Sequence, residues 1–74
     1  MNKTEALVKI EEALKKMNCT DIAFPDPQEN LIVAVFNCKQ VTSFVEDIQG
    51  WTYSGIHLDP TKVHQYKIDF KKTI

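Results

Sequence analysis

The chain contains no arginine, although it has nine lysines and ten acidic residues. Arginine is the usual bidentate ligand for phosphate and for guanine in nucleic acids. The formal net charge is −1, so the chain also lacks the positive excess that attracts a protein to a polyanion. These two absences argue against nucleic acid as a partner.

Glycine is scarce too, with two residues in the whole chain, which excludes a glycine-rich phosphate-binding loop. The sequence has no Ser-His-Asp arrangement within a supporting motif and no motif that pairs two catalytic carboxylates. No apolar run approaches the roughly 20 residues that a membrane-spanning helix needs. We therefore expect a protein that is not an enzyme, carries no cofactor and does not enter a membrane.

The two cysteines come without a secretory signal. Residues 1–16, MNKTEALVKIEEALKK, contain three glutamates and lack the apolar segment that targets a chain for secretion. Cysteines in a reducing compartment remain thiols. The expected location is the cytoplasm.

The clearest local pattern is a helix from Lys3 to Met17. Asn2 and Glu5 have the spacing of a capping box at its start. Asn18 is expected to end it in the left-handed conformation. The apolar residues at helical spacing are Ala6, Leu7, Ile10, Ala13, Leu14 and Met17.

A hairpin and a second helix are predicted next. TDIAF (20–24) alternates, and PDPQEN (25–30) cannot be a strand because its prolines remove donors. LIVAVF (31–36) is the longest apolar run and forms the second strand. Asn37 and Gln40 then make a second capping box. The apolar stripe of this second helix consists of Val41, Phe44, Val45 and Ile48.

Two further strands, WTYSGIHL (51–58) and VHQYKIDF (63–70), complete an αββαββ order. Two αββ units can pack as a two-layer α+β sandwich, with a four-stranded antiparallel sheet in the order 3-4-2-1 and two helices on one face. This is a permuted ferredoxin-like plan, with the first strand moved to the end of the chain, and the topological analogy carries no function. We expect a single domain over residues 1–74, frayed at 1–2 and 71–74.

The register of each hairpin decides which side chains face the helices. We expect the second hairpin to pair His57 with His64. Cross-strand partners share a face of the sheet, so this pairing determines which side chains lie on the helix side. The set expected on the helix side is Trp51, Tyr53, Tyr66, Ile68 and Phe70, and the polar set expected on the open side is Thr52, Ser54, Gln65, Lys67 and Asp69.

The central strand LIVAVF is apolar on both faces, so one of its faces needs a cover. A first hairpin that pairs Phe24 with Leu31 sends Ile22, Phe24, Leu31, Val33 and Val35 to the helix side. It leaves Ala23, Ile32, Ala34 and Phe36 on the open side. An exposed apolar patch of this kind marks a contact surface, unless a loop or the C-terminal tail covers it. These four are the candidate protein-binding residues, and a slip of one residue would reverse the two faces.

Soft ligands gather at one end of the predicted sheet. The candidates are Cys19, Cys38, His57 and His64. Zinc needs its ligands about 2.0–2.3 Å from one centre, whereas four strands side by side span roughly 14 Å. No CxxC or HxxxH spacing is present. We therefore expect no metal site, while a disulfide between the two cysteines is geometrically allowed under oxidation.

The sequence favours a small non-enzymatic protein-interaction module, such as an inhibitor, an adaptor, an immunity-type or a regulatory factor. It would bind a protein partner, or itself as a weak homodimer, through the open face of the sheet. One alternative is a sheet that binds single-stranded nucleic acid through Tyr53, Tyr66 and Lys67. Another is a metal- or redox-responsive protein that uses the cysteines and histidines.

Overall fold

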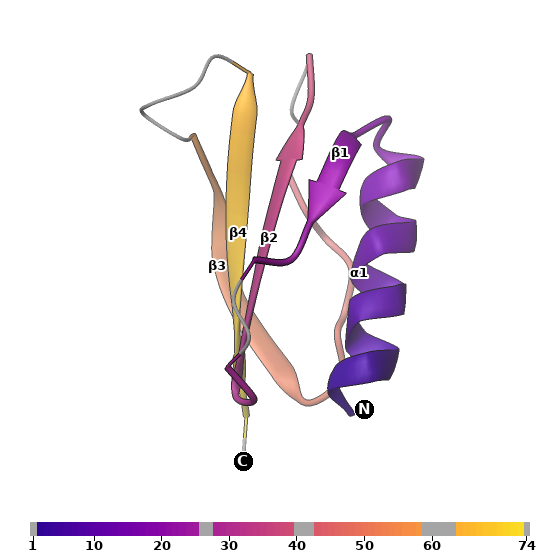
Figure 1. The fold of residues 1–74 in the computed structure, drawn as a ribbon. Coiled ribbons are helices and arrows are strands. Elements are labelled where there is room, and N and C mark those ends of the chain that lie inside the picture. Colours follow the sequence, from indigo (N-terminus) through magenta and orange to yellow (C-terminus); the bar gives the residue numbers. More distant parts are fainter. Residues whose placement is uncertain (1, 26–27, 40–42, 59–63, 74) are drawn as a thin grey trace.

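The computed structural model describes residues 2–25, 28–39, 43–58 and 64–73. Its elements are helix α1 (Lys3–Lys16) and the strands β1 (Thr20–Ala23), β2 (Leu31–Asn37), β3 (Trp51–Leu58) and β4 (Gln65–Lys72). The strands form one antiparallel sheet in the order β1-β2-β4-β3 (Figure 1). The predicted α+β class and the predicted strand order are confirmed.

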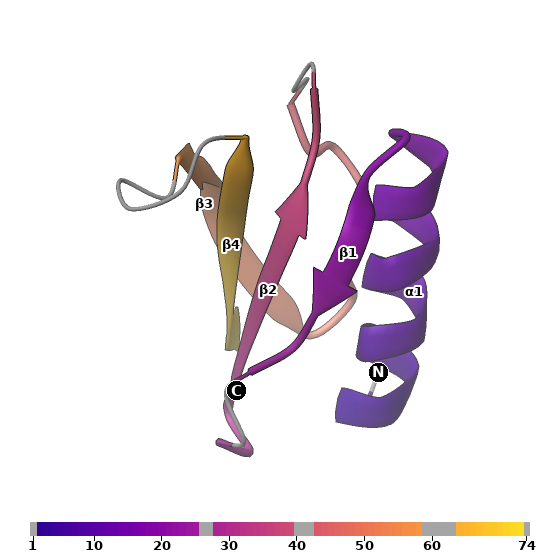
Figure 2. The ribbon, with the colours of Figure 1, turned by 45° about the horizontal axis from the view of Figure 1, so that its top comes forward.

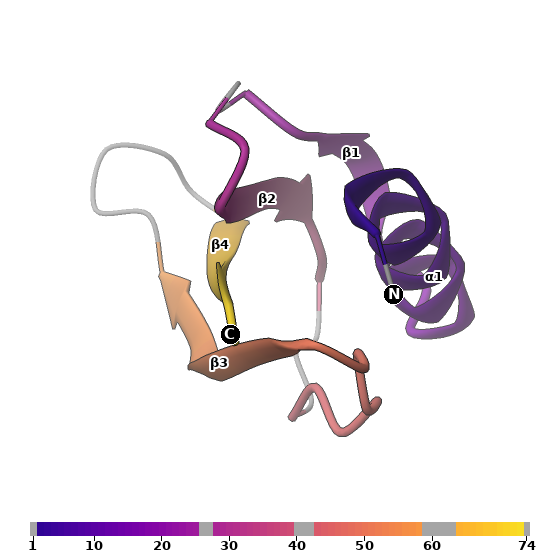
Figure 3. The same ribbon diagram turned by 90° about the horizontal axis from the view of Figure 1, so that it is seen from below.

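The sheet is strongly curved, and the core lies on its concave side. Figure 3 shows α1 on this side near β1, and the segment 43–50 on the same side near β3. The buried cluster joins helix residues such as Ile10 and Leu14 to Phe36 and Phe70 of the central strands. No described element covers the convex side (Figures 1 and 2). Within the described residues, no helix has the length and apolar character to cross a membrane.

Helix α1 forms as its sequence predicts. The backbone N–H of Glu5 donates to Asn2 Oδ1 at 2.8 Å, which satisfies one of the donors at the helix start. Asn18 has φ 63°, so the chain leaves the helix through the left-handed conformation. The buried face of the helix consists of Ala6, Ile10, Ala13 and Leu14.

The second predicted helix is not confirmed. Residues 43–48 have no regular secondary structure, and residues 40–42 of the prediction lie outside the described residues. Asn37, the predicted cap, belongs to β2, and its side chain donates to Asp21 Oδ2 at 2.8 Å. Phe44 and Ile48 are still buried, but in a non-helical segment. The two-helix, ferredoxin-like arrangement is therefore not supported.

Strand β4 extends into the C-terminal residues, for which the sequence predicted fraying at 71–74. Lys71 pairs with Leu31, and Lys72 pairs with Trp51. The backbone N–H of Thr73 donates to the carbonyl of Gly50 at 2.7 Å. The ladder of β4 thus continues to Lys72, while Ile74 lies outside the described residues, and the fraying expected at 71–74 stays a prediction.

The predicted registers of both hairpins are wrong. The structure pairs Ala23 with Val35, whereas the sequence predicted a pairing of Phe24 with Leu31. The register differs by three residues, and an odd shift reverses the face of one strand relative to the other. Asp21 has φ 52° and marks a bulge in β1.

In the second hairpin, His57 lies opposite Lys67 rather than His64. Gly55, at φ 146°, marks a second bulge, in β3. A Cβ at this glycine would meet no atom within 4 Å, so the backbone conformation, not space, favours glycine there.

Candidate protein-interaction face

The pairing of β2 with β4 decides which face of the central strand is buried. Ile32 lies opposite Phe70, Ala34 opposite Ile68, and Phe36 opposite Tyr66. Cross-strand partners share a face, and these partners on β4 face the core. The rings of Phe36 and Tyr66 stack with centroids 6.2 Å apart. The even-numbered residues of β2 therefore point to the concave side of the sheet.

This result corrects the predicted contact patch. Ile32 is 1% exposed, and Ala34 and Phe36 are both 0% exposed, so they are core residues and offer nothing to a partner. Ala23 alone of the four predicted residues is exposed. The error has one physical source: every side chain of the run is apolar, so the strand itself gives no signal of which face is inward.

The convex face carries the other half of the run. Leu31, Val33 and Val35 are partly exposed, and exposed Ala23 lies opposite Val35. We call these four residues, Ala23, Leu31, Val33 and Val35, the convex apolar stripe. A half-apolar open face was predicted, and it exists, but with β2 contributing its odd-numbered residues. The signal that could have found them lies on β4, whose aromatic side must match the inward side of β2.

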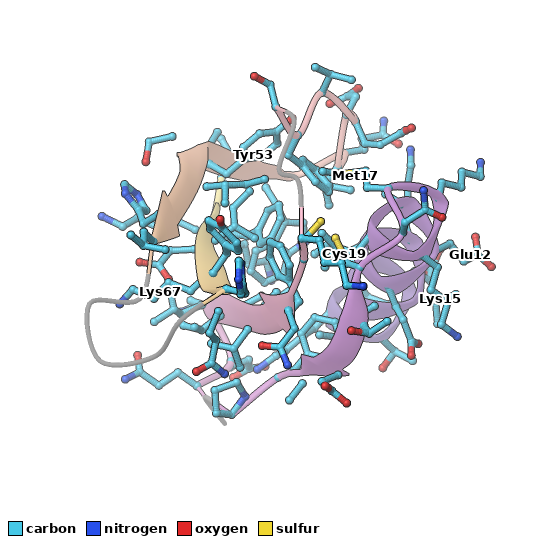
Figure 4. The ribbon with its side chains drawn as sticks, turned by 90° about the horizontal axis from the view of Figure 1, so that it is seen from above. Glu12, Lys15, Met17, Cys19, Tyr53 and Lys67 are labelled. Carbon is cyan, nitrogen blue, oxygen red and sulfur yellow. The ribbon has the colours of Figure 1, made fainter. Side chains whose placement is uncertain are left out.

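Polar residues of β4 border the stripe on the convex face. Lys71 lies opposite Leu31, Asp69 opposite Val33, and Lys67 opposite Val35. Figure 4 shows Lys67 on the side of the sheet away from α1. Lysine stems are long enough to cover neighbouring apolar surface while the ammonium group stays in water. The face thus combines an apolar centre with a charged border, as many contact surfaces do.

Two acceptor atoms on this side of β4 are unsatisfied. Gln65 Oε1 and Asp69 Oδ1 are both buried and have no hydrogen-bond partner among the described residues. A buried acceptor without a donor is costly, so native proteins rarely leave one that way.

The aromatic residues of β3 and β4 lie on the concave, core side of the sheet, where the two tyrosines are partly buried. Tyr53 packs edge-on against Phe44 and Phe70, with ring centroids 5.0 Å and 5.2 Å away. Its hydroxyl donates to the Glu46 carbonyl at 2.6 Å. Tyr66 stacks on Phe36 in the core. Neither ring is presented on the open face, so neither is placed to stack on a base there.

The four predicted metal-ligand candidates divide into two groups. Cys19 and Cys38 are buried and lie together as thiols with a hydrogen bond between them. His57 and His64 are exposed. The described residues contain no cluster of three or more His, Cys, Asp or Glu side chains that could hold a metal ion.

Burial raises the pKa of two acidic groups in the core. The pKa of the Cys19 thiol rises from 9.0 to about 12, first because the thiol is buried and then because of its hydrogen bond with Cys38 and the charge of Cys38. Burial also raises the pKa of Tyr53 above 10.0, with Asp47 and Glu46 adding to the shift. Both groups therefore bind their protons more tightly in the folded state than in the unfolded state.

We predict that the protein loses stability at alkaline pH. Groups with a raised folded-state pKa contribute fully below the unfolded pKa and lose their contribution as the pH rises. For Cys19 the loss runs from pH 9 to about pH 12, and for Tyr53 it begins near pH 10. Each proton changes the free energy of unfolding by at most about 1.4 kcal/mol per pH unit.

Urea unfolding followed by circular dichroism measures this slope. Cys19→Ala should remove the part that begins near pH 9, and a flat profile from pH 8.5 to pH 11 would contradict the assignment.

We compared the chain with known protein families, curated proteins and solved structures. No protein-family model, no curated protein and no solved structure matches the chain. The function is therefore inferred from the convex face itself.

Proposed function

We propose that the chain is a small, non-enzymatic protein-interaction module that binds a protein partner through the convex face of its sheet. An inhibitor, an adaptor, an immunity-type protein and a regulatory factor all fit this role. The observation that carries the proposal is the central strand: β2 is apolar on both faces, and no described element covers its convex face. A cytoplasmic location suits a chain whose two cysteines are thiols.

The size of the face supports a weak contact. Four strands about 4.8 Å apart and up to eight residues long at about 3.3 Å per residue cover at most roughly 500 Å². A pair of such faces buries about 1,000 Å², which is the lower end of the range for specific association. Self-association would therefore be weak, with a dissociation constant on the order of 1 mM to 10 µM.

The chemistry of the face describes the preferred partner. The convex apolar stripe favours a partner that presents an apolar strand or helix face. Lys67 and Lys71 stand on either side of Asp69 along β4. A second copy placed antiparallel on this face could set its lysines against that carboxylate, so a homodimer is compatible with the charges.

Val33→Asp tests the proposal. The added carboxylate lies in the centre of the face and should weaken association about tenfold or more, because association would take this charge out of water. Val8→Asp is the matched control, since Val8 is 52% exposed on α1 and lies outside the stripe. Sedimentation velocity over a concentration series measures self-association of the wild type and of both variants.

A photo-crosslinking residue at position 33 or at position 8 extends the test to a different partner protein. In extract of the native cell, position 33 should capture a defined protein that position 8 does not. Equal capture at both positions, together with no effect of Val33→Asp on self-association, would contradict the proposed surface.

A further inference from the structure

The two cysteines meet where β1 begins and β2 ends. Thr20 lies opposite Asn37, so Cys19 and Cys38 occupy the next position along the same pair of strands. They are 6% and 5% exposed, and their thiols are hydrogen-bonded to each other. Cys38 Sγ also lies 3.8 Å from the carbonyl oxygen of Met17, to which it donates. Figure 4 shows Cys19 and Met17 together between the helix and the sheet.

The backbone around the two cysteines has the geometry of a cross-strand pair that can be bridged. The backbone N–H of Cys19 donates to the carbonyl oxygen of Leu14 at 3.0 Å, and the backbone N–H of Cys38 donates to the carbonyl oxygen of His64 at 3.1 Å. The two residues therefore do not exchange backbone hydrogen bonds with each other. In an antiparallel pair, such non-hydrogen-bonded partners have Cα atoms about 4.5 Å apart. This separation lies within the range of about 4.4–6.8 Å seen for disulfides.

We propose that Cys19 and Cys38 form a reversible intramolecular disulfide when the protein meets a peroxide. One thiol releases its proton, and its thiolate attacks hydrogen peroxide, which breaks the O–O bond and gives a sulfenic acid and hydroxide. The hydroxide takes up the released proton and becomes water. The second thiol then displaces the hydroxyl from that sulfur, forms the S–S bond and gives its proton to the leaving hydroxide as a second water. Both sulfurs are oxidised, and one peroxide is reduced to two waters.

The two thiols are about equally buried, so either sulfur can react first with the peroxide and the other then resolves the sulfenic acid. The bond joins the start of β1 to the end of β2 and closes the loop between them, which restricts the unfolded chain. The thermal midpoint should rise on the order of 10 °C.

The experiment treats the folded wild-type protein with hydrogen peroxide at neutral pH and low concentration, with no partner present. Intact mass should fall by two hydrogens without dimer formation, and a non-reducing peptide map should link Cys19 to Cys38. Dithiothreitol should restore the mass and the original thermal midpoint. Neither Cys19→Ser nor Cys38→Ser should form the intramolecular link, and dimedone should trap the sulfenic acid on the cysteine that remains.

Several outcomes would overturn the inference. These are two thiols that persist under peroxide in the folded state, a link that forms only after urea unfolds the chain, and cross-links only between molecules. The inference does not depend on the proposed function, because every measurement is made on the isolated monomer.

Discussion

The Ala34→Asp variant is expected to be unfolded at 25 °C. Ala34 is 0% exposed and lies opposite Ile68 in the middle of the core. A carboxylate placed there without a partner costs several kcal/mol, whether it stays charged or takes up a proton. A domain of 74 residues has a total stability of only about 4–11 kcal/mol. Far-ultraviolet circular dichroism and a thermal scan should show loss of the cooperative transition.

The neighbouring variant Val33→Asp provides the control. Val33 is partly exposed on the convex face, so its carboxylate reaches water. The variant should fold, with a free energy of unfolding within about 1 kcal/mol of the wild type. The two positions are adjacent and receive the same side chain, and only the face differs. A folded Ala34→Asp beside an unfolded Val33→Asp would reverse the assignment of the faces.

Phe44→Ala is expected to lower the free energy of unfolding by about 3–4 kcal/mol. Phe44 is 6% exposed, and its ring packs edge-on against Tyr53 and Phe70, with centroids 5.0 Å and 5.6 Å away. Its removal leaves a cavity between the segment 43–48 and the sheet. Urea unfolding curves of the variant and of the wild type measure the difference.

Val45→Asp separates this packing from a helical alternative. Val45 is 83% exposed, so the substitution should change the free energy of unfolding by less than about 0.5 kcal/mol. In a helix, Val45 would share the buried stripe with Phe44 and Ile48, and a carboxylate there would cost several kcal/mol. A large loss of stability in Val45→Asp would therefore favour the helix.

Local signals in the sequence predicted the first helix well, and they also predicted which side chains of β3 and β4 face the core. The side chain of Asn2, the apolar spacing up to Leu14 and the left-handed Asn18 all act within a few residues of one another. The aromatic side and the polar side of β4 were also separable, because Ile68 and Phe70 alternate with Lys67 and Asp69. Where one face is apolar and the other polar, the sequence determines which side is inward.

The face of β2 could not be predicted in the same way. All six residues of LIVAVF are apolar, so alternation carries no information, and the long connection to β1 does not fix the register. A bulge at Asp21 then shifts the pairing of the hairpin. Only the long-range pairing with β4 selects the side that buries Phe36.

The predicted second helix failed for a related reason. Phe44 and Ile48 are buried at the spacing that a helix would give, so the apolar pattern was satisfied by another conformation. The Tyr53 hydroxyl donates to the carbonyl of Glu46 at 2.6 Å and lies 3.4 Å from that of Phe44. In a helix those carbonyls would accept from backbone N–H groups four residues on. A tertiary contact thus takes the place of the local one.

A soluble nitroxide, added to protein with labelled methyl groups, tests the exposure of the convex apolar stripe most directly. Paramagnetic broadening reports how closely solvent approaches each methyl group. The structure predicts strong broadening for Val33 and Val35 and protection for Ile32 and Ala34. Broadening of Ile32 and Ala34, with Val33 and Val35 protected, would place the other half of the strand outward and leave the proposed contact surface without a basis.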